Sequence, residues 1–143
     1  SAQLKALAPE TLKGLQADQI VELSPKLVKS FSAEQIGALK KKTFGAMSKD
    51  QLKKLTKDSV TGITKRQLRT VAPNEISVFS PREIAAIDPD AISGLKPKTL
   101  DALSQRQVAS LTDDHLEGLT SRQVNRADEF MDLLSKSQTD FLF

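Results

Sequence analysis

The chain's single histidine lies among residues that could perform hydrolytic or metal chemistry. His115 follows Asp113 and Asp114 and comes five residues after Ser110. A nucleophilic triad with Ser110, or a metal site, is conceivable for such a group. One His in a chain without Cys cannot supply a structural zinc site, however. The sequence therefore favours a helix-capping or surface role for His115, and it predicts no catalytic and no metal-binding residue.

Paired aspartates form a second candidate, for calcium. Asp88 and Asp90 flank Pro89, and Asp113 adjoins Asp114. No loop around either pair supplies the six or more oxygen ligands that Ca²⁺ prefers. Acidic residues are also favourable in the first turn of a helix, and this is the role we expect here. No glycine-rich phosphate loop occurs either, so we expect no cofactor.

The third candidate is a series of lysines that recurs every eight residues in the most basic part of the chain. Residues 1–69 hold 14 of the 21 Lys and Arg, against 6 of the 18 Asp and Glu. The series, here called the lysine ladder, is Lys41, Lys49, Lys57 and Lys65. If successive units stack, these side chains form one ridge suited to an anionic polymer such as nucleic acid or acidic polysaccharide. A solvated lysine face that keeps the protein soluble is the alternative.

The eight-residue spacing extends over nearly the whole chain. Octads that start at Ala8 and follow one another to Ala127, with one partial unit before them, make sixteen units without an insertion. Position 5 is aliphatic or Phe in all sixteen, and position 8 is large and apolar in fifteen. No apolar run approaches the roughly 18 residues of a membrane span.

The polar columns of the octad predict one short helix per unit. Position 1 is Ser, Thr or Asp in ten of fifteen units, and position 4 is Gln or Glu in nine of sixteen, which is the capping-box pattern. All six prolines occupy position 2, the first helical position. All six glycines occupy position 6 or 7, where we expect them to end helices in the left-handed conformation. Small residues at position 7 should also allow close approach of neighbouring helices.

Such short helices require neighbours, because nucleation of an isolated helix is costly. The sequence therefore predicts an all-α solenoid, or superhelix, of about sixteen short capped helices over residues 1–127. A 16-residue alternation of Gln at position 4 suggests two helices per layer. The octad phase fails after Ala127, so residues 128–143 should form a capping helix, roughly over 128–136, and an apolar tail.

The segments "FSAEQIGAL", "LSQRQVASL" and "LTSRQV" resemble the tandem LTxxQ(I/V)xxL arrays of large bacterial surface or secreted proteins. More distantly, "FSPREIAAIDPDAISGL" is similar to the helical superhelix repeats of mesothelin and stereocilin. The bacterial resemblance implies a non-enzymatic spacer, adhesive or scaffold module, cut from a larger secreted or cell-surface protein. Its partner would be another macromolecule, a protein or polysaccharide in preference to nucleic acid. Binding of an anionic polymer through the lysine ladder is the alternative function.

Overall fold

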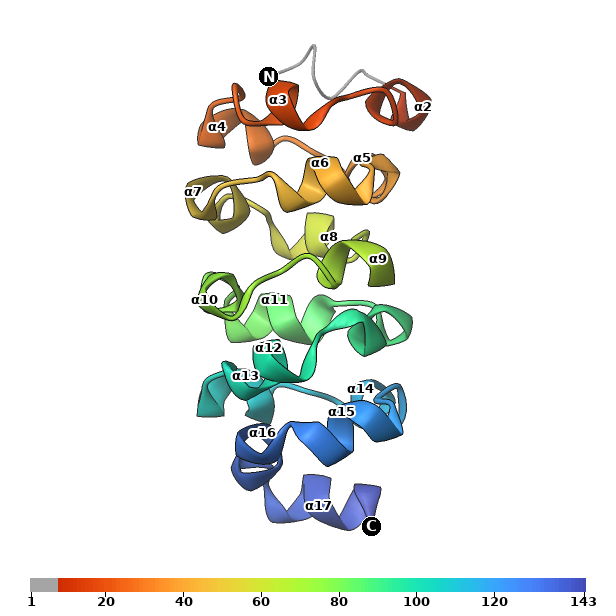
Figure 1. Ribbon diagram of the computed structural model, residues 1–143, viewed down its shortest axis with the longest axis vertical. Coiled ribbons are helices and arrows are strands. Elements are labelled where there is room, and N and C mark those ends of the chain that lie inside the picture. Colours follow the sequence, from red (N-terminus) through yellow and green to blue (C-terminus); the bar gives the residue numbers. More distant parts are fainter. Residues whose placement is uncertain (1–7) are drawn as a thin grey trace.

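The computed structural model describes residues 8–143, and it confirms the prediction of an all-α superhelix of short helices (Figure 1). Every octad from residue 8 to residue 127 forms one helix. The partial first unit, with Leu4 and Leu7, lies outside the described residues. The elements are α2 (Pro9–Leu12), α3 (Ala17–Ile20), α4 (Pro25–Val28), α5 (Ala33–Ala38), α6 (Lys41–Gly45), α7 (Lys49–Lys53), α8 (Lys57–Val60), α9 (Lys65–Leu68), α10 (Pro73–Ile76), α11 (Pro81–Ala86), the 3₁₀ helix η1 (Pro89–Gly94), α12 (Pro97–Asp101), α13 (Gln105–Ala109), α14 (Asp113–Glu117), α15 (Ser121–Arg126), α16 (Asp128–Leu133) and α17 (Lys136–Leu142).

The helices begin where the octad pattern predicts. In α5, the Ser32 hydroxyl accepts a hydrogen bond from the Gln35 backbone N–H at 3.1 Å, and the Gln35 side-chain oxygen accepts from the Ser32 N–H at 2.9 Å. The same reciprocal bonds start α7, α9, α13 and α15. All six prolines lie in the first turn of their helices. Side-chain caps or first-turn prolines therefore mark the start of most units.

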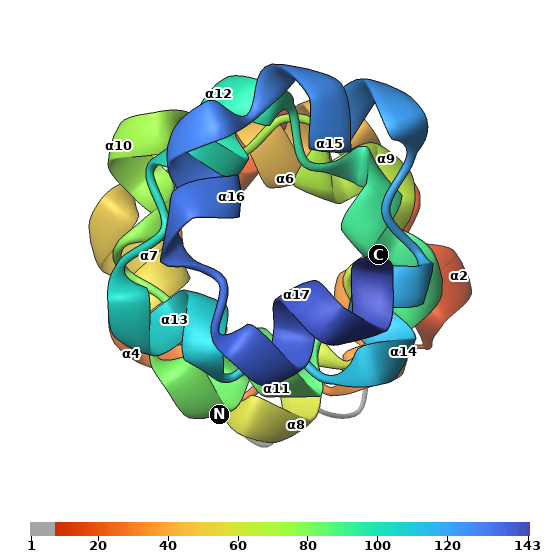
Figure 2. The same ribbon diagram turned by 90° about the horizontal axis from the view of Figure 1, so that it is seen from below.

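Successive helices do not stack on one another; they follow the circumference of the superhelix, as the view along its axis shows (Figure 2). Each helix packs against the helix three octads away, as α2 does on α5 and α5 on α8. Hydrogen bonds between turns join residues 28 apart, such as Thr43 and Leu15. One turn therefore takes about 28 residues, or three and a half octads. The prediction of two helices per layer is wrong, because alternate octads are not the ones that pack together.

The position-4 glutamines link each turn to the one before it. The Gln67 side-chain oxygen caps its own helix by accepting from the Thr64 N–H at 3.0 Å. The amide nitrogen of the same side chain donates to the carbonyls of Ile36 and Leu39, both at 2.8 Å. This double role recurs at Gln51, Gln107, Gln123 and Gln138. Each of these side chains is buried with all its polar atoms paired, so it stabilises both the helix start and the stacking of turns.

Positions 5 and 8 form one continuous apolar core inside the superhelix. Position 5 is buried in every described octad except the last, where Val124 is half-buried. Position 8 is buried from Phe31 to Leu111 and half-buried nearer the ends, as at Leu15 and Leu119. The core prediction is thereby confirmed. The helices have four to seven residues, and this burial replaces the stability that such lengths lack in isolation.

The glycines differ from the prediction, because none of the six has a positive φ. The other prediction for position 7, close approach of neighbouring helices, is confirmed at Gly62 and Gly94. A Cβ on Gly62 would overlap the Ala33 backbone, and one on Gly94 would overlap the Lys65 carbonyl. In both pairs the overlapping residue lies 29 positions earlier in the chain. The helices end instead through ordinary right-handed or extended residues, and Gly62 and Gly94 allow close packing between turns.

The C-terminal segment also differs from the prediction, because residues 128–143 hold two helices where one over 128–136 was expected. Ala127, fully buried, both ends α15 and precedes α16, so the repeat loses one residue there. The octad pattern then resumes: Ser135 and Gln138 form a capping box, and Gln138 donates to the carbonyls of Val108 and Leu111 at 2.9 and 3.2 Å. The apolar tail forms the end of α17, with Phe141 and Phe143 exposed.

Replacing Gly62 or Gly94 by Ala should lower the free energy of unfolding by about 2 kcal/mol, because the new methyl group meets backbone atoms that cannot move independently. Gly14 is the matched control: it is exposed, and the nearest atom to an added Cβ is 3.5 Å away. Gly14→Ala should be neutral or stabilise by up to about 1 kcal/mol. Chemical denaturation checks this. Equal stability of all three variants would show that close approach is not the role of these glycines.

Candidate binding groove

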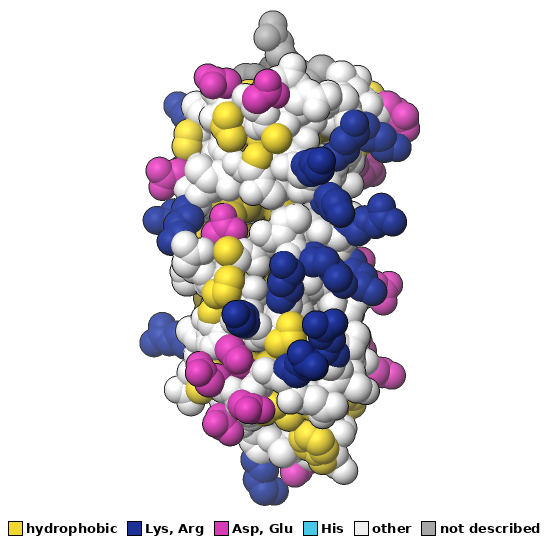
Figure 3. Space-filling model, in the orientation of Figure 1, with side chains coloured by type: hydrophobic (Ala, Val, Ile, Leu, Met, Phe, Trp, Pro, Cys, Tyr) yellow, Lys and Arg dark blue, Asp and Glu magenta, His cyan; other side chains and the backbone are white. Residues whose placement is uncertain are grey.

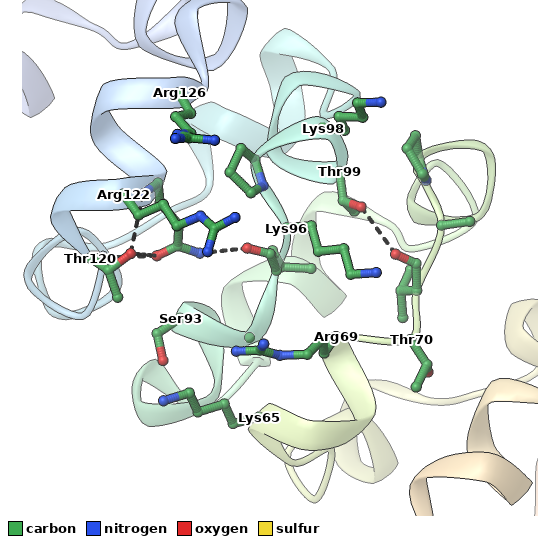
Figure 4. Close-up of a pocket in the computed structure, with 17 residues that line it drawn as sticks. Lys65, Arg69, Thr70, Ser93, Lys96, Lys98, Thr99, Thr120, Arg122 and Arg126 are labelled. Carbon is green, nitrogen blue, oxygen red and sulfur yellow. Dashed lines mark hydrogen bonds between the residues drawn. The ribbon is translucent and has the colours of Figure 1, made fainter.

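A groove of about 870 Å³ crosses the outer surface between α9, the segment from η1 to α12, and α15 (Figure 4). Its lining comes from residues 65–73, 93–99 and 120–126, three segments that follow one another at close to the 28-residue register. The groove therefore crosses three successive turns along the superhelix axis. Six cationic side chains line it: Lys65, Arg69, Lys96, Lys98, Arg122 and Arg126.

Hydrogen bonds between turns hold the three segments of the groove together. The Thr99 hydroxyl donates to the Val71 carbonyl at 3.0 Å, and the Gln123 amide nitrogen donates to the Leu95 carbonyl at 2.7 Å. Gly94 lies directly against the Lys65 backbone. The floor is consequently formed by fixed backbone, while the cations extend from it on flexible stems.

The groove is unbalanced in charge. No Asp or Glu lines it, and all six cations are exposed. Ion pairs in residues 8–143 join Lys13 to Glu10 and Lys136 to Asp140, and neither pair includes a groove residue. Six positive charges without acidic partners produce a positive electrostatic potential. The concave shape of the groove concentrates this potential.

The basic surface extends beyond the groove as a stripe along the axis, visible on one face of the molecule (Figure 3). Hydrogen bonds connect the successive turns along this stripe. They join Thr43 to Leu15, Gln67 to Leu39, Thr99 to Val71 and Gln123 to Leu95. Lys41 lies two residues before Thr43, and Arg69 lies 28 residues after Lys41. The register thus places basic residues of successive turns above one another on the same face.

The lysine ladder does not have the geometry that the sequence suggested. Lys41, Lys49, Lys57 and Lys65 are all exposed, but they begin α6, α7, α8 and α9, which follow one another around the circumference (Figure 2). They therefore point to different sides of the superhelix and form no single ridge. Of the four, Lys65 lines the groove. The prediction failed because residues align along the axis at 28-residue spacing, whereas the ladder recurs every eight.

Five of the six groove cations were not singled out from the sequence. A period of 28 residues relates Lys41 to Arg69, and it continues to residues 97 and 125, which are flanked by Lys96, Lys98 and Arg126. This spacing was present in the sequence. It had no meaning until the number of octads per turn was known, so the eight-residue column was the more obvious pattern.

His115 has the capping role that the sequence favoured, although it is buried and not at the surface. Its Nδ1 accepts from the Thr112 N–H at 3.1 Å, and its Nε2 donates to the Ile87 carbonyl at 2.6 Å. These are the two roles of the position-4 glutamines, and the carbonyl acceptor requires the proton on Nε2. Both ring nitrogens are thus used within the fold. A triad with Ser110 is not formed, because the Ser110 hydroxyl donates to the Gln107 carbonyl.

Three of the four paired aspartates line an acidic hollow at the start of η1 and along α14. It is lined by Asp88, Asp90, Asp114 and Glu117. Asp88 caps η1 by accepting from the Asp90 N–H at 2.9 Å, in the role expected from the sequence. Over residues 8–143, no group of three or more His, Asp or Glu is arranged to hold a metal ion. Nor does this part of the chain contain a helix long and apolar enough to cross a membrane.

No family model matches this sequence, and no curated protein matches it either. The resemblance to bacterial octapeptide arrays therefore stays a prediction.

His115→Gln should keep the free energy of unfolding within about 0.5 kcal/mol of the original, because an amide can accept from Thr112 and donate to Ile87 as the imidazole does. His115→Ala should lower it by about 1–3 kcal/mol, since a buried carbonyl loses its partner. Thermal and denaturant unfolding distinguish the two variants. If Gln destabilised the protein as much as Ala, the equivalence of His115 with the glutamines would be refuted.

Proposed function

We propose that this chain is a non-enzymatic interaction module: a stiff superhelical rod that spaces other parts of a protein and presents rows of side chains to a macromolecular partner. The observation that supports this best is the set of side-chain hydrogen bonds that join each turn to the one before it. They run from the second turn to the last: the separation is 28 residues at Gln51, Gln67, Gln107 and Gln123, and 27 at Gln138, after the one-residue loss at Ala127. Each turn is fixed to its predecessor, so bending would break buried hydrogen bonds.

The use of polar side chains supports a structural role. Buried polar side chains in residues 8–143 all have hydrogen-bond partners, and most of these partners are helix starts or carbonyls of the preceding turn. Position 3 is exposed in every described octad, and position 6 is exposed in most of them. A solenoid built in this way offers an extended surface without changing its core.

A second function, binding of an anionic polymer, is favoured by one observation: six cations line a groove that contains no acid. Its site would be the groove and the basic stripe. The lysine ladder, which the sequence suggested for this function, contributes Lys65 to the groove. Spacing and polymer binding are compatible, because a stiff rod keeps the stripe straight.

The spacer role can be tested with spin labels, since the chain has no Cys to interfere. Lys26→Cys and Lys136→Cys place labels at two exposed sites on α4 and near the start of α17. Nearly four turns separate them, so at about 10 Å per layer of packed helices the distance should be about 40 Å. Pulsed dipolar spectroscopy should give one narrow peak, unchanged in moderate salt. A broad distribution would contradict a stiff spacer.

A further inference from the structure

We propose that the groove binds a single chain of acidic polysaccharide, laid along the superhelix axis across three turns. This inference rests on the second function proposed above and names its ligand class. It requires of the superhelix only that the turns stay in register. The carboxylate or sulfate groups of the polymer would pair with the six groove cations. Its sugar rings would lie against the fixed floor.

The direction of the ligand follows from the order of the segments. The lining comes from α9, the segment from η1 to α12, and α15, which belong to consecutive turns. Cations recur in each segment: Lys65 and Arg69 in the first, Lys96 and Lys98 in the second, Arg122 and Arg126 in the third. In the close-up, cations from all three segments surround the same hollow (Figure 4). A ligand that used all three pairs would be an extended chain with negative groups at regular intervals.

The guanidinium groups favour oxyanions with planar or forked geometry. Arg69, Arg122 and Arg126 each present several N–H donors that can bind a carboxylate or sulfate with two hydrogen bonds. Their acidic partners are absent from the groove, as shown above, so no internal ion pair has to break when a ligand binds. Long-range attraction should make binding sensitive to salt.

The remaining lining favours sugar over single-stranded nucleic acid. Sequence-tolerant binding of single-stranded nucleic acid relies on aromatic side chains that stack on bases, and no aromatic residue lines the groove. A peptide cannot add to a strand edge here, because residues 8–143 form no strand. An acidic peptide held by the arginines is the competing ligand that the experiment below compares directly. The groove offers instead the ring faces of Pro73 and Pro97, and hydroxyls including that of Ser93. An acidic sugar has a surface that matches this lining, because its apolar C–H faces are bordered by hydroxyl and charged groups.

The experiment uses the full 143-residue chain and a fluorescently labelled heparin oligosaccharide, followed by anisotropy at low and at physiological salt. We expect saturable binding that weakens steeply as salt rises. Labelled oligothymidylate and poly-L-glutamate of matched charge should bind more weakly, and neutral dextran should not bind. Longer heparin oligosaccharides should bind more tightly until they span the three turns.

Two variants with the same change in net charge locate the site. Arg69→Gln, Arg122→Gln and Arg126→Gln together remove three groove cations, and we expect affinity for heparin to fall about tenfold or more. The matched control neutralises Lys49, Lys53 and Lys57, which are exposed but lie outside the groove, and it should change affinity less than threefold. A second groove variant, Lys65→Gln with Lys96→Gln and Lys98→Gln, applies the same test if the first is unstable.

Two results would overturn the proposal. Equal loss of affinity in groove and control variants would mean that net charge, not the groove, attracts heparin. Tighter binding of oligothymidylate or poly-L-glutamate than of heparin would assign the groove to nucleic acid or to an acidic peptide. Either result leaves the spin-label distance unaffected, so failure of this inference and failure of the spacer function can be told apart.

Discussion

The structure depends on one side chain with two partners: the position-4 glutamine. Its oxygen accepts from the backbone N–H at the start of its own helix, and its nitrogen donates to two carbonyls of the preceding turn. In α13, for example, Gln107 accepts from Ser104 at 2.8 Å and donates to Ile76 and Phe79 at 3.0 and 2.8 Å. An amide can do both because it carries an acceptor and two donors. The unit length and the superhelical register are thereby linked through one residue.

Other residues at position 4 meet this constraint in part or not at all. Thr43 and Thr99 donate to one carbonyl through a shorter side chain, and His115 replaces the amide with an imidazole. Ala91 and Phe130 fill position 4 with apolar atoms. Glu83 keeps the cap, at 2.9 Å from the Ser80 nitrogen, but an ionised carboxylate cannot donate, and it stays half-buried. After the one-residue loss at Ala127, Gln138 recovers the link at separations of 30 and 27 residues.

The sequence predicted what is decided within one octad. Caps, first-turn prolines and the two apolar columns are local features that repeat in each octad. Ser32 could therefore be assigned as a helix cap, and Ile84 as a core residue, without knowing how many octads make one superhelical turn. The number of octads per turn depends on helix packing angles, which no eight-residue pattern contains. The predicted single ridge of lysines was wrong for this reason, and the close approach predicted for position 7 could not be assigned to particular partners. Gly62 is needed because of Ala33, and Lys41 comes into register with Arg69, only once the turns are stacked.

The most direct test of the central interaction is the isosteric exchange Gln107→Glu, measured by chemical denaturation near neutral pH. The carboxylate can still cap α13, but it faces two carbonyls to which it cannot donate, and it is buried. We predict a loss of at least about 2 kcal/mol in the free energy of unfolding. The reverse exchange Glu83→Gln, at a half-buried position, should be neutral or stabilising. An unchanged denaturation midpoint for Gln107→Glu would contradict the claim that these amides hold the turns together.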